Sequence, residues 1–176
     1  AVAGVEGKFR VRFMTSHPKD FSAELVSVIK KHDKICNLVH LPAQSGSRRI
    51  LSLMNRRYTR EQYLDKVALL RKEIPDAEIT TDLIVGFPTE TEEELEETLS
   101  LVKEADFSAA FTFINSPRTG TKAAEMEGQI PEEVSKSRIG RLIEQVNENT
   151  RRKSEGYVGR TIEILCEDFD EKKGLY

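Results

Sequence analysis

The chain has 176 residues, of which 38% are hydrophobic and 32% are charged, a composition typical of a folded globular protein. No apolar run approaches the roughly 20 residues of a membrane span, and the first residues lack the apolar core of a signal peptide. These features argue against a membrane-spanning protein. We expect an intracellular protein, with the cytoplasm as the compartment and a mitochondrial or plastid matrix as the alternative.

The net charge of −3 conceals two halves of opposite sign. Residues 1–75 carry 15 Lys and Arg against 7 Asp and Glu, whereas residues 76–176 carry 12 against 23. The basic half could meet phosphate, although solvated helix faces that differ in sign are the more ordinary explanation. The two cysteines, Cys36 and Cys166, match no metal-ligand spacing, so we expect ordinary reduced thiols and no metal ligands in this chain.

Runs with a period of two residues alternate with amphipathic runs of helical period along the chain. In chain order, the pattern predicts a strand at 8–15, a helix at 20–32, a strand at 37–41, helices at 47–54 and 59–74, a strand at 78–87, a helix at 89–105, a strand at 108–114, a loop at 115–129, a helix at 131–153 and a strand at 160–168. Because strands and helices alternate, we expect an α/β fold with a parallel sheet and right-handed crossovers.

Capping signals place two of the helix starts. Thr59 with Gln62, and Thr89 with Glu92, have the spacing of a capping box. The last helix is predicted to turn its apolar residues inward, namely Val134, Ile139, Leu142, Ile143 and Val146.

Polar or Gly/Pro-bearing segments follow four of the predicted strands, at residues 15–18, 42–47, 86–91 and 115–121. The carboxyl ends of parallel strands meet at one edge of the sheet, and ligands of open α/β sheets bind beyond that edge. We therefore expect these four segments to form one functional rim.

The segment 42–47 contains Gln44 and Ser45, whose side chains can hydrogen-bond to ribose hydroxyls or to a carboxylate. Gly46 would let backbone N–H groups approach a ligand closely. A plain turn followed by Ser47 as a helix N-cap explains the same residues without a ligand, and both interpretations stay open.

Asp82 lies within an otherwise apolar strand. Strand alternation puts Thr80, Asp82 and Ile84 on one face and the intervening residues on the other. A buried carboxylate without a partner is costly, so Asp82 should face a ligand or form a structural hydrogen bond. Of the histidines, His17 is expected to start a helix and His40 to be a hydrogen-bonded core residue.

Basic residues crowd the stretch from 48 to 72, in which Tyr58 follows two arginines. Cations beside an aromatic ring suit nucleic acid, while a solvated pair of helices is the alternative. The candidate nucleic-acid contacts are Arg48, Arg49, Arg56, Arg57 and Arg60. No P-loop, GxGxxG segment or catalytic-triad signature is present.

Five segments carry a resemblance to a known family: "RFMTSHPKDF", "HLPAQSGS", "LMNRRYTREQY", "TTDLIVGFPTETEEE" and "FTFINSPRTGT". Together they resemble the radical S-adenosylmethionine methylthiotransferases, and "TSHPKDF" is closest to the branch that modifies isopentenylated adenosine beside the anticodon of tRNA. The resemblance implies the second half of a parallel (β/α) radical barrel, that is, a partial TIM-type barrel.

The resemblance also implies S-adenosylmethionine as radical source and methyl donor, two 4Fe-4S clusters in the whole enzyme, and the anticodon stem-loop of tRNA as partner. The implied cofactor-binding residues are Gln44, Ser45, Asp82, Ile84, Gly86, Phe113 and Arg118. The arginines from Arg48 to Arg60 would face tRNA.

The two three-cysteine motifs of the family precede every segment found here, so their cluster ligands are absent from this chain. We expect residues 1–156 to be the C-terminal portion of the radical barrel and residues 157–176 to begin a TRAM-type RNA-binding β domain, with no activity for this piece alone. Thr119 and Lys122 depart from the family pattern, so their loop is expected to differ in shape.

Two alternative functions stay open. One is a sister enzyme acting on a ribosomal protein or on threonylcarbamoyl-adenosine tRNA, and the other is a non-enzymatic half barrel that binds RNA or a partner.

Overall fold

The computed structural model describes residues 1–14, 17–163, 169 and 171–174, and within them a parallel sheet of three strands. The strands are β1 (Leu38–His40), β2 (Glu78–Val85) and β3 (Ala109–Ile114), in the order β1-β2-β3. His40 lies opposite Thr80, and Asp82 lies opposite Phe111. The predicted α/β class and parallel sheet are confirmed.

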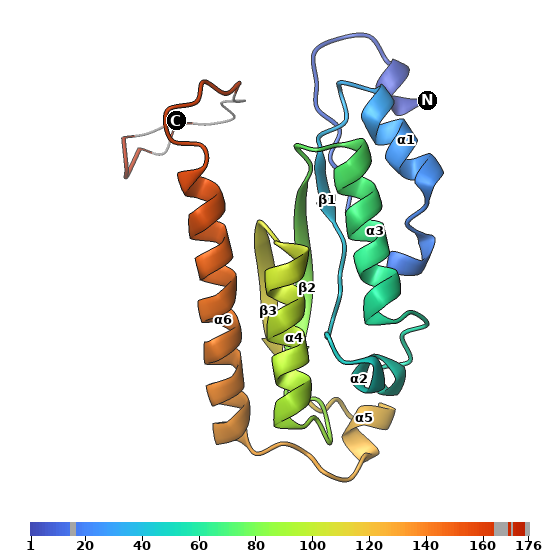
Figure 1. Ribbon diagram of the computed structural model, residues 1–176, viewed down its shortest axis with the longest axis vertical. Helices are drawn as coiled ribbons and strands as arrows, with labels where there is room; N and C mark the ends of the chain where they lie inside the picture. Colours follow the sequence, from blue (N-terminus) through green and yellow to red (C-terminus); the bar gives the residue numbers. More distant parts are fainter. Residues whose placement is uncertain (15–16, 164–168, 170, 175–176) are drawn as a thin grey trace.

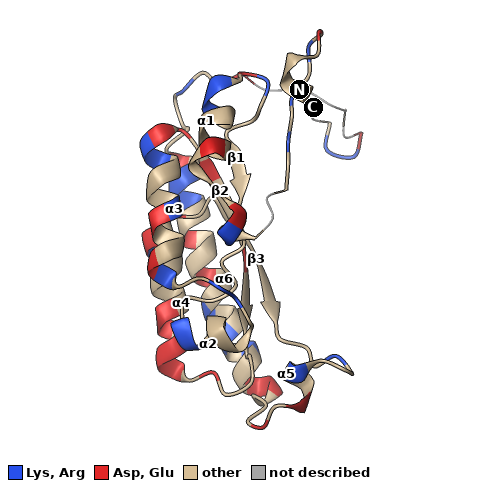
Figure 2. Ribbon diagram, turned by 90° about the vertical axis from the view of Figure 1, so that its right-hand side faces the viewer, with Lys and Arg blue, Asp and Glu red and all other residues tan. Residues whose placement is uncertain are grey.

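The described helices are η1 (Val2–Gly4), η2 (Pro18–Asp20), α1 (Ala23–Lys31), α2 (Arg48–Leu53), α3 (Arg60–Glu73), α4 (Glu92–Ala105), α5 (Lys122–Glu125) and α6 (Glu132–Glu155). Figure 1 shows α3, α4 and α6 side by side against the sheet, with α2 and α5 at the lower end, where the strands finish. In Figure 2 the long helices lie on one face of the sheet, and within the described residues the other face has no covering helix. This is the arrangement expected of part of a (β/α) barrel.

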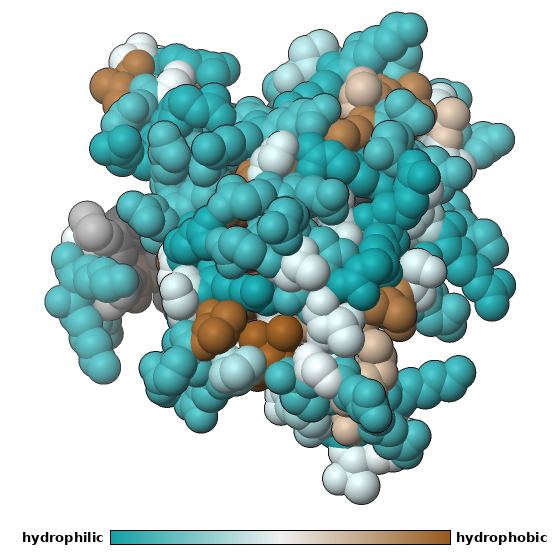
Figure 3. Space-filling view, turned by 60° about the horizontal axis from the view of Figure 1, so that its bottom comes forward, coloured by the Kyte–Doolittle hydropathy of each residue, from teal (hydrophilic) through white to brown (hydrophobic). Residues whose placement is uncertain are grey.

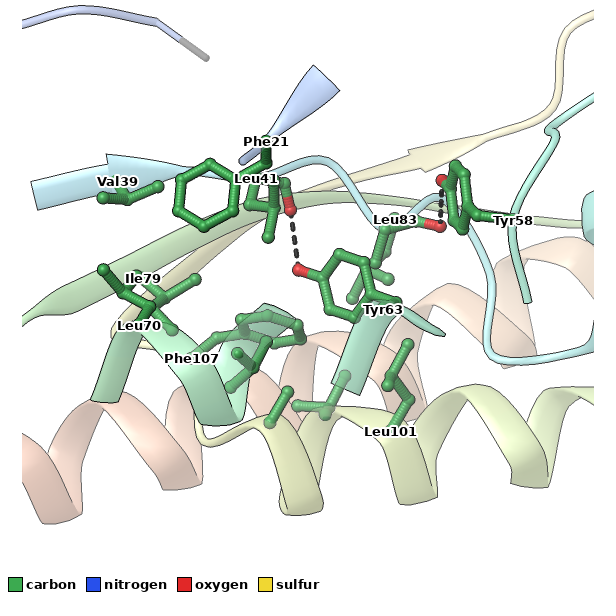
Figure 4. Packing of buried hydrophobic residues seen from close by; sticks show 14 of the residues in the cluster. Phe21, Val39, Leu41, Tyr58, Tyr63, Leu70, Ile79, Leu83, Leu101 and Phe107 are labelled. Carbon is green, nitrogen blue, oxygen red and sulfur yellow. Dashed lines mark hydrogen bonds between the residues drawn. The ribbon is translucent and has the colours of Figure 1, made fainter. Parts of the chain in front are cut away.

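The alternation of β2 positions the core and the open face. Ile79, Thr81, Leu83 and Val85 are buried against the helices, whereas Thr80, Asp82 and Ile84 are half-buried on the open face, as predicted. Figure 4 shows the core around Tyr63, whose hydroxyl donates to the Leu41 carbonyl at 2.7 Å. Each fully buried large apolar side chain contributes about 1.5–3 kcal/mol relative to exposure.

The capping box predicted at Thr59 and Gln62 is confirmed, but the one predicted at Thr89 and Glu92 is wrong. The second box is formed by Thr91 and Glu94, two residues later. Thr89 is in the left-handed region with a φ of 66°, and its N–H donates to the Gly128 carbonyl at 2.8 Å. Thr89 therefore belongs to the turn after β2, and the helix begins two residues later than predicted.

The strand predicted at 8–15 is also wrong for the described residues of that range. Val11 and Met14 form only isolated bridges, to Ile35 and His40, so no ladder develops. The loop predicted at 115–129 contains the short helix α5. A strand was also predicted at 160–168. Residues 160–163 form no strand, and residues 164–168 lie outside the described residues.

The inward face of α6 differs from the prediction. Leu142 and Val146 are buried, but Val134 and Ile143 are 39% and 42% exposed. The buried stripe instead includes three polar residues: Ser135, Arg138 and Asn149. Arg138 donates to Glu90, and Asn149 donates to the Val102 carbonyl at 2.8 Å, so hydrogen bonds to neighbouring segments compensate in part for the burial of these two residues. Among the described residues, no helix combines the length and apolar character needed to cross a membrane.

Candidate functional site

A groove of about 450 Å³ lies at the carboxyl ends of β2 and β3, with the segment around α5 as its other wall. It is lined by Gln44, Asp82, Ile84, Phe113, Ile114, Asn115, Ser116, Arg118, Thr121 and Ala123. The lining combines an amide, a carboxylate and a guanidinium with apolar side chains, of which Phe113 is 50% exposed. Figure 3, viewed toward this end of the molecule, shows a mainly hydrophilic surface with a few compact hydrophobic groups.

Gln44 is fixed at the groove by backbone hydrogen bonds to β2. Its N–H donates to the Asp82 carbonyl at 2.8 Å, and its carbonyl accepts from the Ile84 N–H at 2.9 Å. The residue has a φ of 67°, a left-handed conformation that costs a non-glycine residue about 1–2 kcal/mol. The chain therefore remains hydrogen-bonded to β2 beyond the end of β1, and these bonds hold Gln44 beside Asp82.

Asp82 is 28% exposed in its side chain and lies next to a buried histidine of the neighbouring strand. Its Oδ2 is 3.5 Å from His40 Nε2, and His40 Nδ1 is 3.0 Å from Thr80 Oγ1. The expectation that Asp82 would have a polar neighbour is met. His40 is buried and hydrogen-bonded, as predicted, and His17 caps η2 by accepting from the Lys19 N–H at 3.2 Å.

The structure does not bring Ser45 into the groove. Its side chain is buried, with Oγ accepting from the Ser47 N–H at 3.1 Å and lying 3.4 Å from Thr98 Oγ1 on α4. The adjacent Gly46 donates its N–H to the same Thr98 hydroxyl at 2.9 Å. A Cβ on Gly46 would lie 2.3 Å from the Glu97 carbonyl oxygen, so close contact with α4 explains the glycine without a ligand.

Gly86 also lies outside the groove lining, at the turn after β2. It has a φ of 72°, and a Cβ there would lie 2.5 Å from Ser135 Oγ. Its N–H donates to Glu90 Oε1 at 3.2 Å. Glycine is therefore required by the left-handed turn and by the packing of α6 on it.

Two ion pairs that the sequence analysis did not identify hold this turn. Arg138 of α6 donates to the Glu90 carboxylate at 2.8 Å, and burial raises the pKa of Glu90 despite this partner. Arg49 donates to both oxygens of Glu94 and to the Thr89 carbonyl. Burial alone would raise the pKa of Glu94, but its hydrogen bonds with Arg49, the Thr91 N–H and Ser47 hold it below the ordinary value.

The structure divides the five candidate nucleic-acid arginines into two groups. Arg48, Arg49 and Arg60 form ion pairs with Glu61, Glu94 and Glu104, at 3.2, 2.7 and 2.7 Å. Within the described residues, the side chains of Arg56 and Arg57 form no ion pair. Each arginine of the first group therefore has an acidic partner within the chain, and the Arg48–Glu61 pair lies at the surface.

Arg57 lines a second groove, of about 440 Å³, between η2 and α3. It is lined by Lys19, Arg57, Tyr58, Gln62, Asp65, Lys66 and Leu69. Three cations face one carboxylate there, and Lys66 also donates to the Phe21 carbonyl at 2.8 Å. Lys19 joins this basic groove from a distant part of the sequence, which is why the local run of arginines did not indicate it.

The described residues contain no group of three or more His, Cys, Asp or Glu side chains arranged to hold a metal ion. Cys36 is a half-buried free thiol, and Cys166 lies outside the described residues. An iron–sulfur cluster needs three or four thiolates together. The described residues therefore do not fit such a cluster.

Comparisons with known proteins give one consistent family. The Radical SAM superfamily matches residues 2–102. The tRNA-2-methylthio-N(6)-dimethylallyladenosine synthase of Clostridium botulinum (strain Langeland) is 53% identical over 166 residues, covering 94% of this chain and 37% of the relative. The proteins of the same name from Moorella thermoacetica and Caldicellulosiruptor saccharolyticus are 54% and 49% identical, covering 94% and 99% of this chain and 37% of each relative. The chain thus spans a little over a third of the length of these relatives.

The solved structure of coproporphyrinogen III oxidase from Escherichia coli, described as a Radical SAM enzyme, superposes with a TM-score of 0.55 at 17% identity. The match covers 81% of this chain and 30% of that structure. At this identity it supports the fold alone, and it agrees with a sheet that is part of a larger α/β barrel.

Proposed function

Since this chain belongs to the Radical SAM superfamily, we propose that it is part of an enzyme that adds a methylthio group to N6-isopentenyladenosine beside the anticodon of tRNA. The observation that carries the proposal is the identity of 49–54% to relatives that share one name, over nearly the whole chain. In that enzyme, residues 1–156 would belong to the radical barrel and residues 157–176 would begin an RNA-binding β domain. The bacterial relatives favour a cytoplasmic setting.

We assign the 450 Å³ groove to S-adenosylmethionine, which supplies a radical for activating a C–H bond when it is bound beside an iron–sulfur cluster. The donor set fits a zwitterionic, sugar-bearing molecule. Gln44 and Asp82 can accept hydrogen bonds from hydroxyl or ammonium groups, and Arg118 can pair with a carboxylate. Ile84 and Phe113 offer apolar contact to an adenine ring.

Ser45 and Gly86 would act on this groove indirectly. Ser45 packs the turn that holds Gln44 against α4, and Gly86 forms the tight turn below Ile84. We therefore propose that Ser45 and Gly86 support the wall of the groove and do not contact the cofactor themselves. Residues for an iron–sulfur cluster are expected in the part of the protein that lies beyond this chain.

We propose that tRNA phosphates contact the basic groove, with Arg57 and Lys19 as principal cations and Arg56 beside them. These side chains have no ion-pair partner within the described residues, so phosphate contact would not first require breaking an internal pair. Arg48, Arg49 and Arg60 would contribute less, because each is already paired with a glutamate.

The direct test uses the full-length protein with its clusters reconstituted anaerobically, S-adenosylmethionine, a reductant, and tRNA that carries isopentenyladenosine. Mass spectrometry of digested nucleosides should show the gain of one methylthio group on that adenosine. Unmodified tRNA, together with methylthiolation of a ribosomal protein in a parallel reaction, would overturn the proposal in favour of the protein-modifying sister enzyme. Absence of both products from an enzyme that still cleaves S-adenosylmethionine would overturn both.

A further inference from the structure

His40 is a buried titratable residue to which the proposed function gives no role. It ends β1, and its side chain is on the open face of the sheet, together with Thr80 and Asp82 of β2. The residue is only 6% exposed, although no helix covers this face within the described residues. The Phe111 ring of β3 meets the imidazole edge-on at a centroid distance of 6.1 Å. His40 thus lies in a fixed position one strand away from the groove carboxylate.

The two contacts of the imidazole select one tautomer. Nδ1 lies 3.0 Å from the Thr80 hydroxyl, and Nε2 lies 3.5 Å from Asp82 Oδ2. If Nδ1 carried the proton, the lone pair of Nε2 would face a carboxylate, which is repulsive. If Nε2 carries it, the Thr80 hydroxyl donates to Nδ1 and the Nε2–H points toward Asp82. Only the second arrangement, or the fully protonated ring, is electrostatically favourable at both ends.

The backbone of Asp82 is also held in place by its neighbours. Its carbonyl accepts from the Gln44 N–H at 2.8 Å, and the strand pairs with Phe111 in register. The Nε2–Oδ2 distance of 3.5 Å exceeds that of a normal hydrogen bond, so this contact is an electrostatic one between the imidazole and the carboxylate. The His40 contact is to Oδ2, which leaves Oδ1 for a donor in the groove.

We infer that His40, with its tautomer set by Thr80, is a positioning residue that orients the Asp82 carboxylate so that one oxygen accepts a hydrogen bond from a hydroxyl or ammonium group of the groove ligand. This inference rests on the proposed assignment of the groove to S-adenosylmethionine. It adds a specific unit of three side chains, Thr80, His40 and Asp82, which are linked by one hydrogen bond and one electrostatic contact.

Two substitutions at the same position separate positioning from mere structural support. In His40→Asn, the amide oxygen can take the place of Nδ1 and accept from the Thr80 hydroxyl, so the contact with Thr80 is kept and the donor to Asp82 is lost. In His40→Gln, the amide nitrogen reaches the place of Nε2, so the donor to Asp82 is kept. The affinity of the full-length, cluster-loaded protein for S-adenosylmethionine is measured by calorimetry for both.

We expect about a tenfold loss of affinity for His40→Asn, equivalent to about 1.4 kcal/mol, and less than a threefold loss for His40→Gln. In an Asp82→Asn background, His40→Asn should cause no further loss. Equal losses for both variants, or a loss that persists without the Asp82 carboxylate, would overturn the inference.

Folding is checked by thermal melting, and Thr80→Val supplies a second variant if His40→Asn is unstable. Removing the Thr80 hydroxyl should weaken affinity in the same direction, and only while Asp82 is present. The tRNA product of the unsubstituted protein is an independent measurement. A correct methylthio product with no His40 effect would therefore refute this inference alone, and a wrong product would refute the proposed function.

Discussion

Arg138 and Glu90 form an ion pair in which both side chains are more than nine-tenths buried, with Nη1 2.8 Å from Oε1. The same guanidinium nitrogen donates to the Glu90 carbonyl at 3.0 Å, and Glu90 Oε1 also accepts the Gly86 N–H. The pair therefore fastens α6 to the turn after β2, at the end of the strand that carries Asp82. Breaking a buried pair by removing one partner is costly, because the other charge stays buried.

Arg138→Met should lower the free energy of unfolding by about 3–5 kcal/mol at neutral pH. The folded-state pKa of Glu90 already lies above its ordinary value of 4.5, and loss of Arg138, which lowers it, would raise it further. A raised carboxyl pKa favours the folded state at low pH, and that contribution is lost as pH rises through the folded value. The difference in unfolding free energy between Arg138→Met and the unsubstituted protein should therefore become smaller as pH falls toward 4.5.

Chemical denaturation of the full-length protein at several pH values measures this effect, with Lys136→Met as the control. Lys136 is an exposed residue of the same helix, paired with Glu132 at 2.8 Å, and its loss should leave the unfolding midpoint nearly unchanged. A deficit for Arg138→Met that does not depend on pH would show that lost packing, not the charge of Glu90, is responsible.

Gly46→Ala should destabilise the protein by about 1–3 kcal/mol, because the new Cβ would overlap the backbone of α4 at the Glu97 carbonyl. Gly140→Ala is the matched control: this α6 glycine has no atom within 4 Å of its Cβ position, so alanine should stabilise the helix by up to about 1 kcal/mol. Melting temperatures of the two variants should move in opposite directions. A neutral result for Gly46→Ala would mean that α4 can shift away from the turn.

Lys19→Glu combined with Arg57→Glu should weaken tRNA binding and flatten its salt dependence. Each lost phosphate contact reduces the slope of log affinity against log salt concentration by about 0.7–0.9. Lys136→Glu makes the same type of charge change on α6, which lies apart from α3 (Figure 1), and should leave the slope unaltered. Fluorescence-anisotropy titrations of the full-length protein at three salt concentrations compare them. If the double variant keeps the original slope, the basic groove is a solvated surface.

Asp82→Asn preserves the shape of the side chain and removes its charge. In the full-length protein it should weaken S-adenosylmethionine binding by roughly ten- to a hundredfold, the equivalent of one charge-assisted hydrogen bond. Thermal stability should change little, because the side chain is part-exposed and its described charged contact is with His40 at 3.5 Å. A large fall in melting temperature with unaltered affinity would make the role of Asp82 structural.

Local patterns in the sequence determined much of the fold. The period-two alternation of β2 and the capping box at Thr59 depend on neighbouring residues only, and both were predicted correctly. The segments after β1, β2 and β3 could likewise be placed on one rim, because parallel strands end at the same edge, whereas the segment at 15–18 follows no described strand. Gln44 was singled out on that basis and Asp82 by its place in an apolar strand, whereas Ile84, Phe113 and Arg118 were implied by the family resemblance. The structure brings these five residues to one groove.

Tertiary structure decided the features that depend on residues far apart in the chain. Gly46 is explained by the backbone of α4, about fifty residues away, and Arg138 of α6 holds the turn whose Thr89 was mistaken for a helix cap. The buried polar residues of α6 were missed for the same reason. A sequence does not reveal that an Arg or Asn is buried, because its hydrogen-bond partner lies in a distant segment. Likewise, the sequence indicated that His40 is buried and that Asp82 needs a neighbour. Only the register of β1 against β2 shows that the two are neighbours, because a shift of one residue would turn Asp82 to the opposite face of the sheet.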